Sequence, residues 1–254
     1  MRKSKNLQNR CFWLFLYSSL HNLYEKAGLT LRELKQKNGC GKMSEVKVET
    51  EKVASEFLGT MVLVLIGMGA FSTMDNFEGA IAFGLAYAMM VTLTMNISGG
   101  HLNPAVTLGM MAMKKIDNET GFWYIVVQCM GALAGMVVLT NVLSGTMPGV
   151  QDNSAGTSVW YVLAGEAVMA FLIMLTWMAT VNKGTTPSVA GFGVGAMAAL
   201  ALMVGDYAMN PALHLANSLH VGTLSGGTFW MYWLGPVIGC AAAAMFWDRV
   251  YEEE

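Results

Sequence analysis

Charged residues are scarce in this sequence, and their scarcity excludes several classes of protein. Only 13% of the residues are Asp, Glu, Lys or Arg, against about 25% in an average soluble domain. The 54% hydrophobic content excludes a disordered chain, and the net charge of −2 excludes a strongly basic nucleic-acid-binding domain. Cysteine is rare as well, and Cys129 and Cys240 lie in apolar stretches without the Cys-x-x-Cys pairs or nearby His of a zinc site. We therefore expect a membrane protein with no metal and no cofactor.

Charge is missing altogether from two long stretches. Gly79 to Met113 is a run of 35 residues without Asp, Glu, Lys or Arg, and Tyr207 to Trp247 is a run of 41. A helix that crosses the hydrocarbon layer needs about 20 apolar residues, so each run exceeds one span but is too short for two spans and a loop. Each run therefore holds an additional segment inside the membrane. The predicted spans are residues 53–72, 79–97, 121–143, 159–181, 189–204 and 228–247.

The cations predict the orientation of these six spans. Nine of the 15 Lys and Arg residues lie in residues 1–42, and the others are Lys47, Lys52, Lys114, Lys115, Lys183 and Arg249. With a cytoplasmic N-terminus, every cation falls on the cytoplasmic side, as the positive-inside rule requires. We expect both termini in the cytoplasm.

The two halves of the chain repeat one another at an offset close to 108. Glu56 matches Glu166, Tyr124 matches Tyr232, and Asn103-Pro104-Ala105 matches Asn210-Pro211-Ala212. Each half holds three spans, so equivalent helices cross the membrane in opposite directions, and the two copies form an inverted repeat. The predicted organisation is a basic cytoplasmic tail over 1–52, a membrane domain over 53–248 with repeats at about 53–143 and 159–247, and a short acidic tail over 249–254.

The additional uncharged segments precede the two Asn-Pro-Ala sequences. Both segments are turn-like and then become helical, because Asn is a good N-cap and Pro is tolerated in the first helical position. We expect two short re-entrant helices that start in the middle of the membrane. Irregular backbone at that depth is tolerated only where protein packs on it or water reaches it, so these loops favour an aqueous pathway.

These motifs resemble those of the aquaporin, or major intrinsic protein, family. The resemblance rests on the segment from Ser98 to Thr107 and on Tyr232-Trp233-Leu234-Gly235-Pro236, and it covers about residues 53–248. It implies an all-α fold with six transmembrane helices and two re-entrant half-helices. It also implies a homotetramer in the lipid bilayer that passively conducts water and small neutral solutes such as glycerol, ammonia or peroxide, without enzymatic chemistry and without a nucleic-acid partner.

The resemblance assigns roles to residues of both motifs. Two half-helix N-termini, each equivalent to about half a positive charge, repel cations where they meet, and the amides of Asn103 and Asn210 donate to passing water. Glu56, Glu166 and Gln128 are expected to hold the loops in place. Because charged groups inside spans are often functional, a proton relay through the two glutamates is the alternative.

The sequence departs from the family at the outer constriction. Counting from the motifs places Phe83, Ala198, Tyr207 and Leu213 there, and Leu213 stands where the family has Arg. Loss of the Arg removes a donor that strips solutes of hydration, and it also removes a positive barrier and widens the mouth. Phe83 favours water selectivity, whereas Ala198 favours wider pores.

The histidines and Asp206 leave questions open at the sequence level. His101 is predicted to line the inner vestibule, and His214 is either a hydrogen-bonded core residue or a pH-sensitive gate. Asp206 either caps its loop or favours cations at the mouth, and His220 receives no role. Two further readings of the whole protein stay open, a secondary transporter and a poorly conducting scaffold.

Overall fold

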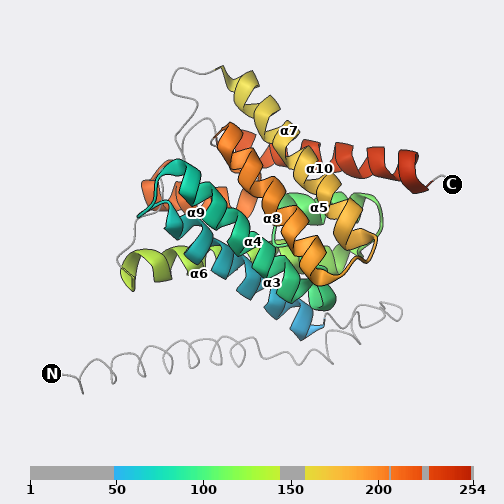
Figure 1. Cartoon of the computed structure of the whole chain (residues 1–254), viewed down its shortest axis with the longest axis horizontal. Helices are drawn as coiled ribbons and strands as arrows, with labels where there is room; N and C mark the ends of the chain where they lie inside the picture. The colour runs from blue at the N-terminus through green and yellow to red at the C-terminus, as the bar shows by residue number, and fades with distance from the viewer. Residues whose placement is uncertain (1–48, 144–157, 206, 225–228, 253–254) are drawn as a thin grey trace, which may run out of the picture. The chain divides into compact units, whose positions relative to one another are not determined.

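The computed structural model describes residues 49–143, 158–205, 207–224 and 229–252, all within one compact unit that spans Lys47–Glu254. The predicted tail up to residue 48, together with Asp206, lies outside the described residues. The described part of the chain forms eight helices and no strand (Figure 1).

Six of these helices are long and two are short. The long ones are α3 (Thr50–Val62) with its π-helical continuation η1 (Leu63–Met68), α4 (Asn76–Ser98), α6 (Asn118–Asn141), α7 (Val159–Trp177) with η2 (Met178–Asn182), α8 (Pro187–Val204), and α10 (Met231–Trp247) with η3 (Asp248–Glu252). The short ones are α5 (Pro104–Ala112) and α9 (Pro211–Val221), each of which begins directly after one of the two asparagines. The predicted pattern of six spans and two half-helices is confirmed.

Four helices are long and apolar enough to cross a membrane on length and composition alone: Asn76–Ser98, Asn118–Asn141, Val159–Asn182 and Pro187–Val204. Less than half of each apolar window is buried inside the protein. On α4, for example, Leu85, Met89 and Leu93 follow one another at helical spacing and are each about 60% exposed. Apolar faces of this kind require lipid around them, so the chain is an integral membrane protein.

Glycines allow the long helices to cross at close range. A methyl group on Gly131 or Gly135 of α6 would overlap backbone carbonyl oxygens of α3. Gly239 of α10 would overlap the backbone of α7 in the same way, and Gly195 of α8 would overlap that of Gly84 in α4. These glycines let the helix backbones approach closely, and α4 and α8 lie side by side in Figure 1.

The packing of the half-helices follows the inverted repeat. The pair α3 and α6 in the first half corresponds to the pair α7 and α10 in the second. The short helix α5 packs against α10, and α9 packs against α6. Each half-helix therefore contacts the last long helix of the other half, which places the starts of α5 and α9 where the two repeats meet.

Candidate functional site

Both half-helices start with the same cap. The side-chain Oδ1 of Asn103 accepts a hydrogen bond of 2.8 Å from the Ala105 N–H, and Oδ1 of Asn210 accepts one of 3.1 Å from the Ala212 N–H. Pro occupies the first helical position in each case, where a missing N–H costs nothing. The side-chain nitrogens of both asparagines are thereby turned away from their own helices.

These nitrogens reach across to the opposite loop. Nδ2 of Asn103 donates to the carbonyl of Met209 over 2.9 Å, and Nδ2 of Asn210 donates to the carbonyl of Leu102 over 2.8 Å. The two asparagines, both no more than 3% exposed, are thus brought together with the N-termini of their helices facing the same point. We call this reciprocal pair of bonds the asparagine clasp.

The clasp depends on two residues that sequence reasoning missed. Leu102 and Met209, which directly precede the asparagines, have φ angles of 51° and 52° in the left-handed region. A side chain in that region costs about 1–2 kcal/mol, and here the conformation turns each carbonyl toward the asparagine of the other repeat. Their equivalent position in the two repeats is the signal from which they could have been found.

Glu56 anchors the first loop with four hydrogen bonds. Its Oε1 accepts from Ser98 Oγ at 2.6 Å and from the His101 N–H at 3.0 Å. Its Oε2 accepts from the Leu102 N–H at 2.7 Å and from Gln128 Nε2 at 2.8 Å. The carboxylate is completely buried, and all of its neighbours in these bonds are donors, as an anchoring role requires.

Glu166 holds the second loop in a simpler way. Its two oxygens accept from the N–H groups of Ala208 and Met209 at 2.6 and 2.7 Å. The residue is also completely buried. Each glutamate therefore binds the backbone just before an asparagine, which is where the sequence analysis expects loop support.

His101 is almost completely buried among aromatic rings. Its ring makes edge-on contacts with Tyr124 and Trp177 at centroid distances of 5.4 and 5.2 Å. Its Nδ1 lies 3.1 Å from Thr107 Oγ1, and the residue is 3% exposed. Its backbone carbonyl accepts a long hydrogen bond of 3.4 Å from the Tyr87 hydroxyl.

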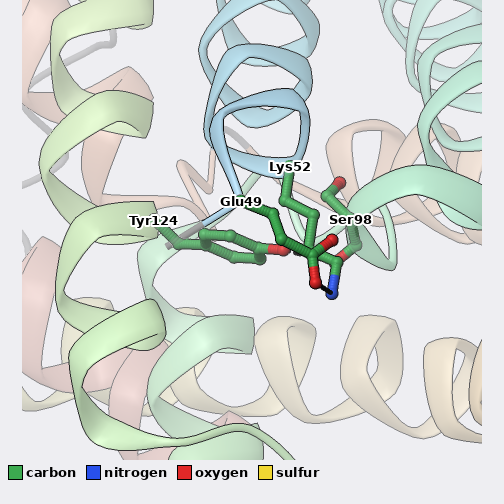
Figure 2. Close-up of polar contacts among 4 residues, drawn as sticks. All are labelled: Glu49, Lys52, Ser98 and Tyr124. Carbon is green, nitrogen blue, oxygen red and sulfur yellow. Dashed lines mark hydrogen bonds and ion pairs between the residues drawn. The ribbon is translucent and has the colours of Figure 1, made fainter. Parts of the chain in front are cut away.

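Tyr124 extends the hydrogen bonds around Glu56 through Ser98. Figure 2 shows its hydroxyl pointing toward the Ser98 carbonyl, to which it donates over 3.0 Å. The same view includes Glu49 and Lys52, which form an ion pair of 3.2 Å at the start of α3. Because Ser98 also donates to Glu56, the hydroxyl of Tyr124 is linked through one residue to the carboxylate that holds the first loop.

The four residues expected at the outer constriction share one apolar cluster. Phe83, Ala198 and Leu213 are buried in it, and Tyr207 packs against it. The Tyr207 ring lies against α7 and its own loop, since a methyl group on Gly165 or Gly205 would overlap it. Leu213, at the position where the family has Arg, is uncharged and only 2% exposed.

The remaining histidines differ in their surroundings. His214 is buried and stacks on Tyr232 of α10, with ring centroids 4.0 Å apart and planes 16° apart. Its Nε2 lies 3.0 Å from Ser218 Oγ. His220 is exposed near the end of α9.

Comparisons with known proteins agree on one family. The family model described as major intrinsic protein matches residues 42–247. Aquaporin TIP2-3 of Arabidopsis thaliana is 34% identical over 216 residues, which cover 78% of this chain and 86% of that protein. Human aquaporin-1 is 30% identical over 219 residues, 78% of this chain and 81% of that protein.

A solved structure agrees with the fold. The X-ray structure of the aquaglyceroporin from Plasmodium falciparum superposes with a TM-score of 0.67, at 20% identity, over 79% of this chain and 96% of that one. Two paired half-helices, a six-span bundle and a family match over most of the chain agree with one another. The chain belongs to the major intrinsic protein family.

Proposed function

We propose that this protein is a passive membrane channel for water and other small neutral solutes, with the asparagine clasp at its centre. The observation that carries the proposal is the pair of bonds from Asn103 to Met209 and from Asn210 to Leu102, which bring two helix N-termini to one point inside the protein. Relatives named as aquaporins support water as a solute.

Cations are excluded by the positive electrostatic potential where the N-termini of α5 and α9 meet. Each helix N-terminus is equivalent to about half a positive charge, and the carboxylates of Glu56 and Glu166 accept from N–H groups of the preceding loops rather than from the first turns of α5 and α9. Neutral solutes pass this point, whereas hydronium and metal cations are repelled. No catalytic step is part of this function.

The asparagines also orient the solute. A side-chain amide carries two N–H donors, and the clasp uses one donor of each asparagine. We assign the second donor to the solute in the lumen. A water that accepts from it is turned so that it does not accept from the next water, which interrupts proton transfer along the file.

Selectivity is assigned to Phe83, Ala198, Tyr207 and Leu213, which the family resemblance places at the outer constriction and which all belong to the main apolar core or pack against it. Because Leu213 stands in place of a cation, this position of the mouth offers a passing solute no hydrogen-bond donor and no positive charge. Glycerol and other small neutral solutes are therefore proposed substrates beside water. The family resemblance further supports a homotetramer, and the positions of Lys and Arg support a cytoplasmic location for both termini.

Vesicle shrinkage tests the function. The purified full-length protein is reconstituted into liposomes and mixed in a stopped-flow device first with sorbitol and then with glycerol. Faster shrinkage than in empty vesicles is expected with sorbitol, followed by re-swelling with glycerol. No acceleration over empty vesicles supports the scaffold alternative, and transport that saturates and depends on an ion gradient supports the secondary transporter.

A further inference from the structure

The two half-helices are attached to the bundle by different chemistry. Thr107 and His214 occupy equivalent positions, four residues after Asn103 and Asn210, and both are buried. The N–H of each donates to the carbonyl of its asparagine, at 3.0 and 3.1 Å. The same turn of helix therefore carries a hydroxyl in the first repeat and an imidazole in the second.

In the first repeat Thr107 joins a hydrogen-bond network. Its Oγ1 donates to the Asn103 carbonyl at 3.1 Å and accepts from Gln128 Nε2 at 3.0 Å. Gln128 in turn donates to Glu56. The start of α5 is thus tied to α6 and, through Glu56, to α3.

In the second repeat, the positions equivalent to three polar residues of the first loop and its support carry no polar side chain. At the offset of 107 that relates the two Asn-Pro-Ala sequences, Ser98 corresponds to Gly205 and His101 to Ala208. At the offset of 108 that relates Tyr124 to Tyr232, Gln128 corresponds to Pro236. None of these three residues has a polar side chain. The start of α9 therefore needs another attachment.

His214 provides it by stacking. Its ring lies nearly parallel to that of Tyr232 on α10 at 4.0 Å, and Phe229 borders it at 5.3 Å. Ser218, one turn further along α9, lies 3.0 Å from Nε2 and sets the plane of the imidazole. Stacked aromatic rings attract one another beyond the area that they bury.

We propose that His214 is the positioning residue that docks the first turn of α9 on Tyr232 and so fixes the placement of Leu213 at the outer constriction. This rests on the proposed channel function. Leu213 is the adjacent residue on the same turn, so a rotation of α9 moves its side chain directly. The stack takes the place that Thr107 and Gln128 fill in the first repeat.

Substitutions of His214 distinguish stacking on Tyr232 from simple filling of a buried space. The variant His214→Leu keeps a buried side chain of similar volume but has no ring to stack, and it is expected to raise the ratio of glycerol to water permeability in vesicles by roughly 2- to 10-fold, the factor that a ring stack represents at equilibrium. His214→Phe keeps the stack and is expected to retain the wild-type ratio. His220→Leu, exposed on the same helix, is the matched control.

Two combined variants make the test specific. Tyr232→Leu added to His214→Leu is expected to change the ratio no further, because both remove the same stack. His214→Thr with Pro236→Gln rebuilds the Thr and Gln pair of the first repeat and is expected to return the ratio toward the wild type. The variant that combines His214→Thr with Pro236→Gln remains informative even where the protein with His214→Leu cannot be reconstituted into vesicles.

The outcomes are distinguishable from failure of the channel itself. If the wild-type protein does not accelerate shrinkage, the proposed function fails before His214 is tested. If the wild type conducts and His214→Leu has the same permeability ratio, or if His214→Phe behaves like His214→Leu, the positioning role is overturned. Additive effects of His214→Leu and Tyr232→Leu overturn it as well.

Discussion

The side-chain amide of Asn103 donates a hydrogen bond to the backbone carbonyl of Met209, 106 residues further along the chain. The matching bond from Asn210 to Leu102 makes the relation reciprocal. Each loop therefore supplies both a donor and an acceptor to the other, and neither half-helix can withdraw without breaking both hydrogen bonds. The centre of the protein is one unit assembled from two repeats.

Replacing Asn210 by Asp removes the donor of one of these bonds. The Leu102 carbonyl is then left without its partner in a buried site, which costs about 1–3 kcal/mol, and the new carboxylate offsets the positive helix ends. We expect a lower unfolding temperature in detergent and a measurable proton leak in vesicles that contain a pH-sensitive dye. Asn118→Asp, in the exposed first turn of α6, is the control, and a leak no greater than its own contradicts the role of the helix ends.

The crossing of α4 and α8 gives a prediction about stability. A methyl group on Gly195 would overlap the Gly84 carbonyl, which is backbone and cannot rotate away. Gly195→Ala is therefore expected to destabilise the protein by about 1–3 kcal/mol, measured by denaturation in mixed detergent micelles.

Gly193 provides the comparison for Gly195 on the same helix. A methyl group there would meet only the Cγ2 methyls of Thr180 and Thr176, at 3.2 and 3.5 Å. Since Ala is favoured over Gly in helices by about 1 kcal/mol, Gly193→Ala is expected to be neutral or stabilising. Equal losses for the two variants contradict the assignment of Gly195 to a close backbone crossing.

Much of this architecture could be predicted from the sequence because the bilayer restricts it. Uncharged runs that are too long for one span and too short for two revealed α5 and α9, and the offset of the Asn-Pro-Ala sequences revealed the inverted repeat. The predicted spans start too late in places: α4 begins at Asn76 rather than at residue 79, and α6 at Asn118 rather than at residue 121. Polar and acidic residues such as Glu78 and Glu119 belong to the first helical turns, where they are favoured.

Other features could not be predicted because they depend on contacts between distant residues. Nothing in the local sequence of Leu102 or Met209 indicates a left-handed backbone, whose carbonyl bonds the opposite asparagine and whose N–H bonds Glu56 or Glu166. The stack of His214 on Tyr232 joins residues on different helices. The sequence predicts the same loop-supporting role for both glutamates. In the structure, Glu56 also has two side-chain donors, Ser98 and Gln128, whose counterparts in the second repeat are Gly205 and Pro236.

This asymmetry predicts different tolerance to Glu→Gln substitution. In Glu56→Gln, the Ser98 hydroxyl and the Gln128 amide can reorient to satisfy the new NH₂ group, so only one backbone N–H loses its partner. In Glu166→Gln, one of two backbone N–H groups loses its partner and no side chain from an equivalent position can compensate. We expect Glu166→Gln to lower the unfolding temperature more, with hydrogen exchange increased at residues 207–209. A larger loss in Glu56→Gln is evidence against redundancy in the first loop.

Leu213 is the position at which selectivity is expected to change most. The residue is buried in the cluster that also holds Phe83 and Ala198, so an Arg at this site must place its guanidinium in the lumen, where water and loop carbonyls can pair with it. Leu213→Arg is therefore expected to narrow the mouth and lower the ratio of glycerol to water permeability, at some cost in stability. Leu219→Arg adds the same charge at an exposed site on α9 and is expected to keep the wild-type ratio. If both variants conduct glycerol and water as the wild type does, Leu213 does not face the pathway and the constriction lies elsewhere.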